Sequence, residues 1–298
     1  MSIPASLDLD AIIARMKAHP LGQEPADMRR AFRQLVLGGA GRPDDGPLSF
    51  RPIEPDPDMA PIVWLHGGGY VFGGPDTHAR TGRYLCDTHG FVVHLPRLPL
   101  APDHRWPAQR DEAREAVEEI AAAGQAPILA GDSSGGHLAL VIAMALARAG
   151  RPVRALLLCS PNTDRTGMSR SREANAGRDL MVDPEEDERL SRMCFGEREE
   201  TDPEVSPLLD DLSLLPPTWI EVGSEEVLLD DARLLAQRAR KAGVEVEFSV
   251  KPGLLHMAQV WAGHWDAADA SLDRAAAFAR RYGASQGEDI RDTEAHPS

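Results

Sequence analysis

The stretch "ILAGDSSGGHLAL", residues 128–140, joins an apolar run to a helix-like run through glycines and two adjacent serines. Its Gly131-x-Ser133-x-Gly135 spacing is that of a nucleophile elbow, in which a strand turns sharply into a helix and exposes one serine hydroxyl. Glycines suit such a turn because the residues two before and two after the serine have no room for a Cβ atom. A glycine-rich loop without chemistry has the same pattern, so the interpretation of Ser133 as a nucleophile depends on its partners.

Apolar runs and helical patterns alternate along the rest of the chain. Strands are predicted at six short runs rich in β-branched or bulky residues, namely 61–65, 91–95, 126–130, 153–159, 217–222 and 244–250. Helical spacing of apolar residues lies between these runs, at 79–88, 108–124, 135–150 and 228–243. The alternation predicts an α/β fold with a mostly parallel central sheet flanked by helices.

Two segments break this alternation. Residues 1–45 hold two amphipathic helix patterns before any convincing strand, and residues 165–213 form a long, charged insertion between two strands. We expect both to form a helical cap over the carboxyl edge of the sheet, where ligands of open α/β sheets bind. The catalytic core would then comprise residues 46–164 and 214–284, and the polar residues 285–298 are expected to be a disordered tail.

Composition narrows the classes of partner. The 298 residues carry a net charge of −15 without any block of Lys and Arg, which disfavours nucleic acid and anionic membranes as partners. The N-terminus lacks a basic start followed by an unbroken apolar core, and no run of about 18 apolar residues occurs. The three cysteines are widely spaced, as suits reduced thiols. These features predict a cytoplasmic protein without a membrane partner.

A reactive serine needs a base to take its proton, and the base is best held by a carboxylate. In the α/β-hydrolase order, the acid follows the serine in the sequence and the histidine follows the acid. The segments "VGSEEVLLDDA" (222–232) and "KPGLLHMAQ" (251–259) supply both, each after a predicted strand. A third segment is "WLHGGGYVFGG" (64–74), which we call the glycine loop. Its His66-Gly67-Gly68-Gly69 stretch offers backbone N–H groups that no bulky side chain shields, as an oxyanion hole requires. Neither a P-loop ending nor dinucleotide-type glycine spacing follows, so a phosphate cradle is not expected.

These motifs together resemble those of the hormone-sensitive-lipase-like branch of the α/β-hydrolase esterases. The resemblance covers roughly residues 60–260 and rests on "HGGGYVFGGPDTH" (66–78), "LAPDHRWPA" (100–108), "GDSSGG" (131–136), "SPNTD" (160–164), "GSEEVLLDDA" (223–232) and "GLLHM" (253–257). It implies an α/β-hydrolase core with a helical cap, and hydrolysis of carboxylic esters without a cofactor.

The resemblance also implies roles for individual residues. Ser133 would be the nucleophile and His256 the base. The backbone N–H groups of Gly68, Gly69 and Ser134 would form the oxyanion hole. The second serine of the pair would then act only through its amide.

The acid of the triad is harder to assign from the resemblance, because the family usually has Asp-Pro-Leu where this chain has Glu226-Val227-Leu228. Aligning Gly223 and Leu228 with the family pattern puts Glu226 at the acid position. Three neighbouring carboxylates are rivals, Glu225, Asp230 and Asp231. For the two aspartates, favourable charge at a helix N-terminus is the simpler interpretation.

A second departure lies in "RLPLAPD" (97–103), where the family's usual Arg and Glu are replaced by Pro99 and Asp103. This puts a structural ion pair in doubt, but not the chemistry. We expect His66 to organise the glycine loop by hydrogen bonding rather than to transfer protons. The histidines His78, His89, His94, His104 and His137 show no metal-ligand spacing, so no metal site is expected.

The insertion contains large apolar side chains whose role stays open. Met181, Met193 and Phe195 would either line an acyl pocket or pack the cap helices, and packing is favoured for at least some of them.

The predicted function is that of a serine carboxylesterase acting on short- to medium-chain esters through a Ser133–His256–Glu226 triad and an acyl-enzyme. The expected partner is a small-molecule ester, and a homodimer is left open. An amidase or arylformamidase, a lactonase or a deacetylase would use the same residues, and a non-catalytic ligand-binding receptor would use the same fold. The presence of a serine, a histidine and a carboxylate favours an enzyme.

Overall fold

A seven-stranded sheet forms the centre of this computed structural model, which describes residues 6–39 and 46–284. Its spatial order is β1-β3-β2-β4-β5-β6-β7. The strands are β1 (Leu48–Phe50), β2 (Ile62–Leu65), β3 (Val93–Leu95), β4 (Ile128–Asp132), β5 (Leu156–Cys159), β6 (Thr218–Gly223) and β7 (Val246–Lys251). Strands β2 to β7 pair in parallel, and only the short edge strand β1, which was not predicted, pairs antiparallel with β3. The predicted mainly parallel sheet is confirmed.

Strands β2 and β5 are apolar along their whole length because both faces of the sheet are covered there. In β2, Val63 and Leu65 face one hydrophobic cluster, whereas Ile62 and Trp64 face the other. All four side chains are fully buried. The central strands therefore carry the side chains that hold both helix layers to the sheet.

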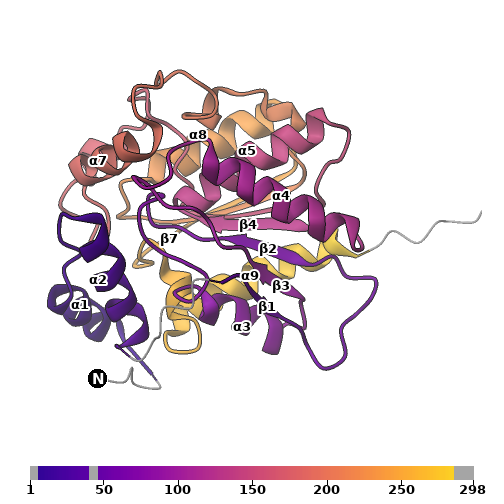
Figure 1. Ribbon diagram of the computed structural model, residues 1–298, viewed down its shortest axis with the longest axis horizontal. Helices are drawn as coiled ribbons and strands as arrows, with labels where there is room; N and C mark the ends of the chain where they lie inside the picture. The colour runs from indigo at the N-terminus through magenta and orange to yellow at the C-terminus, as the bar shows by residue number, and fades with distance from the viewer. Residues whose placement is uncertain (1–5, 40–45, 285–298) are drawn as a thin grey trace, which may run out of the picture.

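Helices lie on both sides of the sheet (Figure 1). Helices α3 (Ala79–Asp87) and α9 (Asp266–Gly283) pack against each other on one side. The other side is covered by α4 (Ala108–Ala122), α5 (Ser134–Arg148) and α8 (Leu229–Lys241). The four predicted helices of the sheet region are all present, and α9 is an addition to them.

The segments that broke the alternation gather at one end of the sheet (Figure 1). The N-terminal helices are α1 (Leu9–Ala18) and α2 (Pro25–Leu37), and the insertion contains α6 (Ser171–Ala174) and α7 (Pro184–Phe195). From α2, Arg29 donates to the backbone oxygens of Val71 at 2.9 Å and Ala101 at 2.8 Å. Because these acceptors lie in the loops after β2 and β3, α2 is attached to loops at the carboxyl edge of the sheet.

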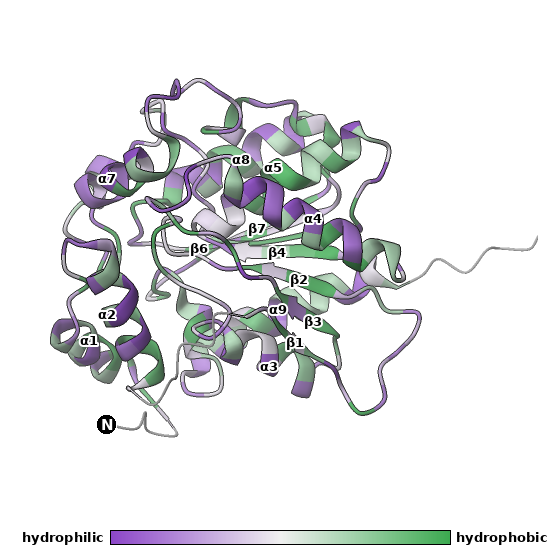
Figure 2. Ribbon diagram, viewed as in Figure 1, coloured by the Kyte–Doolittle hydropathy of each residue, from purple (hydrophilic) through white to green (hydrophobic). Residues whose placement is uncertain are grey.

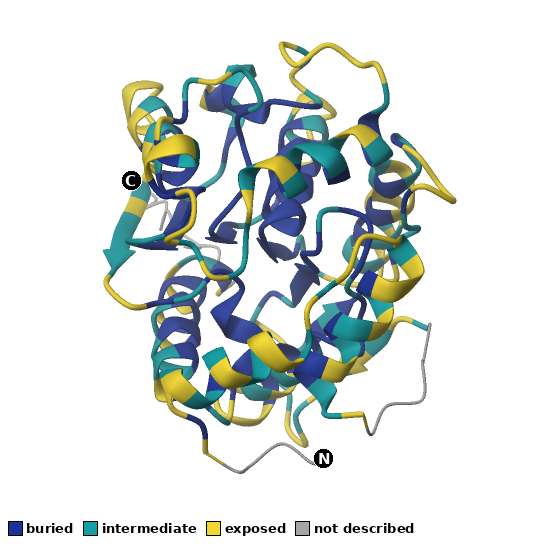
Figure 3. Cartoon of the chain, turned by 90° about the vertical axis from the view of Figure 1, so that its left-hand side faces the viewer, coloured by how far each residue is buried: buried dark blue, intermediate teal, exposed yellow. Residues whose placement is uncertain are grey.

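Burial and hydropathy follow the same plan. Apolar residues concentrate in the strands and on the inward faces of the helices (Figure 2), and the side view shows the buried residues between exposed outer faces (Figure 3). Within the described residues, no helix is both long and apolar enough to cross a bilayer. The predicted tail, 285–298, lies outside the described residues.

Candidate active site

The turn between β4 and α5 has the geometry of the predicted elbow. Ser133 adopts φ 54° and ψ −121°, a backbone conformation that non-glycine residues rarely take. Its backbone is fixed by three hydrogen bonds, from its N–H to Cys159 O (3.0 Å) and to its carbonyl from the N–H groups of His137 (3.1 Å) and Asn162 (3.2 Å). Strained conformations persist only where the surroundings determine them, and here three elements do so.

The flanking glycines are explained by close backbone contacts. A Cβ on Gly131 would lie 2.5 Å from the carbonyl of Gly135, and one on Gly135 would lie 2.0 Å from Leu65 O. The expectation that these positions have no room for a side chain is thus met, and the elbow sits directly against the end of β2.

The predicted base and acid are hydrogen-bonded to each other. The His256 Nδ1–H group donates to Glu226 Oε2 at 2.7 Å, and both side chains are buried, each 2% exposed. The other carboxylate oxygen, Oε1, accepts from Ser160 Oγ at 2.8 Å and from Gly223 N at 2.6 Å. Two donors therefore fix one oxygen of Glu226 and leave the second for the imidazole. Ser160 belongs to the quoted "SPNTD" motif, but no sequence pattern assigned it this role.

The charges around His256 favour its protonated form. Burial lowers its pKa, but the hydrogen bond and charge of Glu226, with the charges of Asp179 and Asp132, outweigh burial and leave the pKa raised above 6.5. A nearby carboxylate that stabilises the imidazolium is what a general base needs at the moment it takes a proton.

The rival carboxylates have other partners. Glu225 is half exposed and pairs with Arg178. Asp230 accepts from Ser171 N at 3.0 Å, and Asp231 accepts from Thr163 N at 2.8 Å. Both aspartates lie in the first turn of α8, where their charge suits the helix N-terminus. Of the four candidates, Glu226 is the one bonded to His256.

The glycine loop after β2 packs against the elbow and the histidine loop. A Cβ on Gly67 would lie 2.5 Å from Asp132 Oδ2, beside the elbow, and 3.0 Å from Met257 Cε, beside His256. Gly68 and Gly69 have positive φ angles of 118° and 58°. Within residues 6–39 and 46–284, the backbone N–H groups of Gly68, Gly69 and Ser134 donate to no other protein group. They are free to bind an oxygen of a ligand.

Two buried histidines support this loop and the elbow. His66 Nδ1 bonds to Gly67 O at 3.0 Å, and burial, with the charge of His78, lowers its pKa to about 4. His78 Nε2–H donates to Asp132 Oδ2 at 3.2 Å, while Trp64 Nε1–H donates to Asp132 Oδ1 at 2.8 Å. Burial raises the pKa of Asp132, but His78 and Trp64 outweigh it and hold the pKa below its usual value. Asp132 is thus an anchored carboxylate next to Ser133.

The apolar residues of the insertion differ in their contacts. Phe195 is buried, and its ring lies 5.2 Å from that of Trp106, 5.6 Å from that of His137 and 5.8 Å from that of Tyr70, measured between centroids. Met181 and Met193 are half-buried against the same core. Phe195 therefore serves packing, as was favoured for at least some of these residues.

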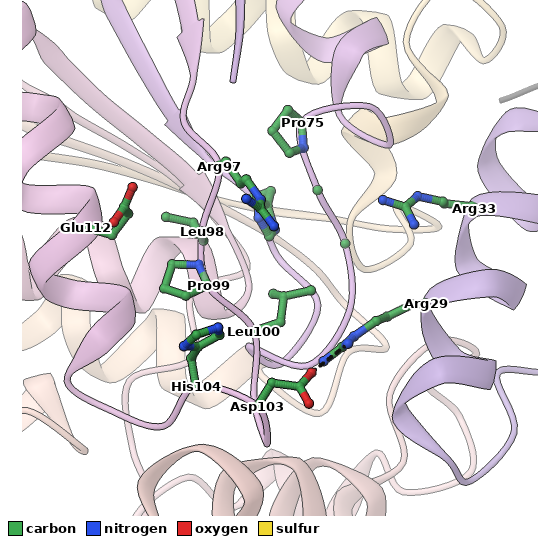
Figure 4. Close-up of a pocket in the computed structure, with 13 residues that line it drawn as sticks. Arg29, Arg33, Pro75, Arg97, Leu98, Pro99, Leu100, Asp103, His104 and Glu112 are labelled. Atoms are coloured by element: carbon green, nitrogen blue, oxygen red, sulfur yellow. Dashed lines mark hydrogen bonds and ion pairs between the residues drawn. The ribbon is translucent and has the colours of Figure 1, made fainter. Parts of the chain in front are cut away.

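A cavity of about 630 Å³ lies between α2, residues 97–104 and both ends of the glycine loop, His66 and Gly73–Gly74 (Figure 4). Neither Ser133, Glu226 nor His256 lines it. At its rim Arg29 Nη1 donates to Asp103 Oδ2 at 2.9 Å. Asp103 therefore pairs with Arg29 of α2. The position at which the family usually has an Arg is occupied by Pro99 in this chain.

No group of three or more His, Cys, Asp or Glu side chains in the described part of the chain could hold a metal ion.

Comparisons with known proteins agree on a family. The model of a family with the α/β-hydrolase fold matches residues 62–260. An acetyl-hydrolase of Streptomyces hygroscopicus is 36% identical over 212 residues, which cover 70% of this chain and 69% of the relative. Esterase LipI of Mycobacterium tuberculosis is 30% identical over 290 residues, covering 92% and 89%. A solved esterase of the bacterial hormone-sensitive lipase family aligns with a TM-score of 0.81 at 29% identity, covering 95% of this chain and 99% of that one.

Proposed function

The chain belongs to the hormone-sensitive-lipase-like branch of the α/β-hydrolase esterases and is a carboxylic ester hydrolase, and we propose that it cleaves short- to medium-chain esters through a triad of Ser133, His256 and Glu226. The observation that carries this proposal is the buried 2.7 Å hydrogen bond between His256 and Glu226, and the strained backbone of Ser133 supports it. A histidine oriented by a carboxylate is the arrangement that activates a serine hydroxyl.

The reaction proceeds in two acyl transfers. His256 takes the proton of Ser133 as the hydroxyl oxygen attacks the ester carbonyl, and the new oxyanion binds the N–H groups of Gly68, Gly69 and Ser134. His256 then gives the proton to the leaving alcohol, which departs from the acyl-enzyme. Water repeats the sequence, with His256 as base, and releases the carboxylic acid. Glu226 holds the imidazole tautomer and stabilises its charged form throughout.

We further propose that residues 1–45 and the insertion, residues 165–213, act together as the cap of this site. In support, α2 contacts the loops after β2 and β3, and α7 packs Leu190 within 2.6 Å of the Cβ position of Gly69. A substrate that reaches Gly69 would therefore pass beside α7.

The test is hydrolysis of p-nitrophenyl esters, from acetyl to long acyl chains, by the wild type and Ser133→Ala. Rapid turnover of short esters is expected, with a loss of at least about 10⁴-fold in the folded variant. Retained activity in Ser133→Ala would refute the nucleophile. A folded wild type without ester turnover would point instead to an amide, a lactone or a non-catalytic receptor.

A further inference from the structure

The peptide unit that joins Glu226 to Val227 is hydrogen-bonded at both its C=O and its N–H group to side chains of the insertion. Asn175 Nδ2 donates to the backbone oxygen of Glu226 at 2.8 Å. At the other end, the N–H of Val227 donates to Asp179 Oδ2 at 2.9 Å. Ser171 Oγ donates to the next carbonyl, that of Val227, at 2.7 Å. All three side chains come from one short segment some fifty residues earlier in the chain.

Asn175 and Asp179 are themselves fixed by burial or by further hydrogen bonds. Asn175 is 5% exposed, and its backbone N–H bonds to Ser171 O at 2.9 Å. The second oxygen of Asp179 accepts from the N–H groups of Met181 at 2.9 Å and Val182 at 3.0 Å. Asp179 thus ties the loop before α7 to the loop of the proposed acid. A displacement of either loop would carry the other with it.

We propose that Asn175 and Asp179 are positioning residues, through which the insertion holds Glu226 against His256. The inference rests on the proposed function, because it takes Glu226 as the triad acid. Its physical basis is that side-chain placement follows the backbone. Displacing a catalytic group by about 1 Å can cost about 10²-fold in rate, and the 2.7 Å bond to His256 leaves little slack.

The two residues differ in charge, which separates their effects. Asn175 is neutral and acts through geometry alone. Asp179 also brings a negative charge that, like those of Glu226 and Asp132, raises the pKa of His256. Removing that charge should therefore move the titration of His256 as well as the acid loop.

The experiment compares Asn175→Ala and Asp179→Asn with a matched control, Asp183→Asn, using p-nitrophenyl butyrate. Asp183 lies in the same segment and accepts from Glu185 N at 3.0 Å and Glu186 N at 3.1 Å, but it bonds to α7 rather than to the acid loop. We expect kcat to fall about 10- to 100-fold in the two test variants, with KM within about threefold of wild type. The control should keep wild-type kcat.

The pH profile separates positioning from mere support of the fold. The acid limb of kcat/KM should move to lower pH in both test variants, because a displaced Glu226 stabilises protonated His256 less, and it should move further in Asp179→Asn, which also removes a charge. A variant that only lowers the folded fraction would lose amplitude without moving the limb. Thermal unfolding of each protein verifies that the measured population is folded, and Asn175→Ala serves alone if Asp179→Asn does not fold.

A Glu226→Gln background separates a failure of the positioning role from a failure of the acid assignment. If Asn175 acts through Glu226, then Asn175→Ala should cost little further activity in Glu226→Gln. Additive losses, or wild-type kcat and pH limb in the single variants, would overturn the positioning role while leaving the triad intact. Near-wild-type activity of Glu226→Gln itself would instead overturn the acid assignment on which the inference rests.

Discussion

At the scale of single residues, the arrangement around Glu226 is the most telling feature of the site. One carboxylate oxygen is occupied by Ser160 and Gly223, and the other faces His256. A carboxylate held in this way cannot rotate without breaking two other hydrogen bonds. The imidazole is therefore offered one fixed acceptor, and its tautomer is fixed with it.

We expect Glu226→Gln to lower kcat/KM by about 10³- to 10⁴-fold, because the amide cannot stabilise the imidazolium and permits the wrong tautomer. Asp230→Asn should cost less than about threefold, since Asp230 bonds to Ser171 and Arg233 rather than to His256. Steady-state hydrolysis of p-nitrophenyl butyrate measures both. The reverse ranking would transfer the acid role to Asp230.

The pH dependence of activity follows from the raised pKa of His256. In the proposed triad His256 must be neutral to take the proton of Ser133, so activity should fall as the pH drops through this pKa. Because the pKa is raised, the midpoint of the acid limb of kcat/KM should lie above 6.5, the ordinary value for histidine. His66 does not account for such a limb, because its pKa is lowered to about 4. A midpoint below 6.5 would contradict the charge arrangement described here.

At the scale of elements, the sequence predicts those parts whose apolar pattern is strong. The fully buried β4 and β5 and the amphipathic α4 and α8 are all found where predicted. The edge strand β1 has the sequence Leu-Ser-Phe and pairs with β3 through its backbone, and three residues are too few for their alternation to predict a strand.

Helix α9 was missed for a different reason. Its buried face is built largely from alanines, Ala268, Ala275, Ala276 and Ala279, whose small side chains give little contrast between apolar and polar positions. Its identity as a helix becomes evident only from its packing against α3.

The residues of the candidate site also divide into those that the sequence predicts and those that it does not. Ser133, His256 and the glycine loop follow from local motifs, because the strained turn and the close backbone approach dictate residues at fixed spacing. Asn175 and Asp179 could not be predicted, since their partners lie about fifty residues away and are chosen by the tertiary fold. Local patterns therefore point to the residues that we propose to react, whereas the residues that we propose to position them become visible only in the three-dimensional structure.

The elbow itself gives a prediction for the β4–α5 element. Gly135→Ala should destabilise the protein by roughly 3 kcal/mol or more, because its Cβ would meet the backbone of Leu65 and neither strand nor helix can shift freely. Gly124→Ala is the control, since no atom lies within 4 Å of its Cβ position and its φ is not positive. Urea unfolding measures both, and equal stability of the two variants would refute the packing argument.

At the scale of the whole molecule, the N-terminal helices and the sheet share one hydrophobic cluster. Met28, Phe32, Leu35 and Val36 of α2 belong to the same buried cluster as Val63 and Leu65 of β2. The ion pairs Arg29–Asp103 and Arg33–Asp76 also join α2 to the loops after β2 and β3. Partly exposed pairs of this kind contribute little, about 0–1 kcal/mol, so burial of the apolar side chains dominates the attachment.

A shared cluster implies that α2 and the sheet unfold together. Phe32 is fully buried, with its ring centroid 5.0 Å from that of Phe72 and 6.5 Å from that of His78. Phe32→Ala should therefore lower the free energy of unfolding by about 3–5 kcal/mol for the whole protein, not for the helix alone. Ile53→Ala, at a side chain that is fully exposed, should change it by less than about 0.5 kcal/mol.

The measurement is urea unfolding followed in parallel by tryptophan fluorescence and by residual esterase activity. Three of the five tryptophans, Trp64, Trp219 and Trp261, are fully buried around the sheet, so fluorescence reports mainly the core. The proposed cap makes activity depend in addition on the helices that cover the edge of the sheet. If the cluster is one cooperative unit, both signals change at the same urea concentration, and Phe32→Ala moves both midpoints equally. Activity lost well before the fluorescence change would mean that α1 and α2 detach separately, and the single-cluster interpretation would then be wrong.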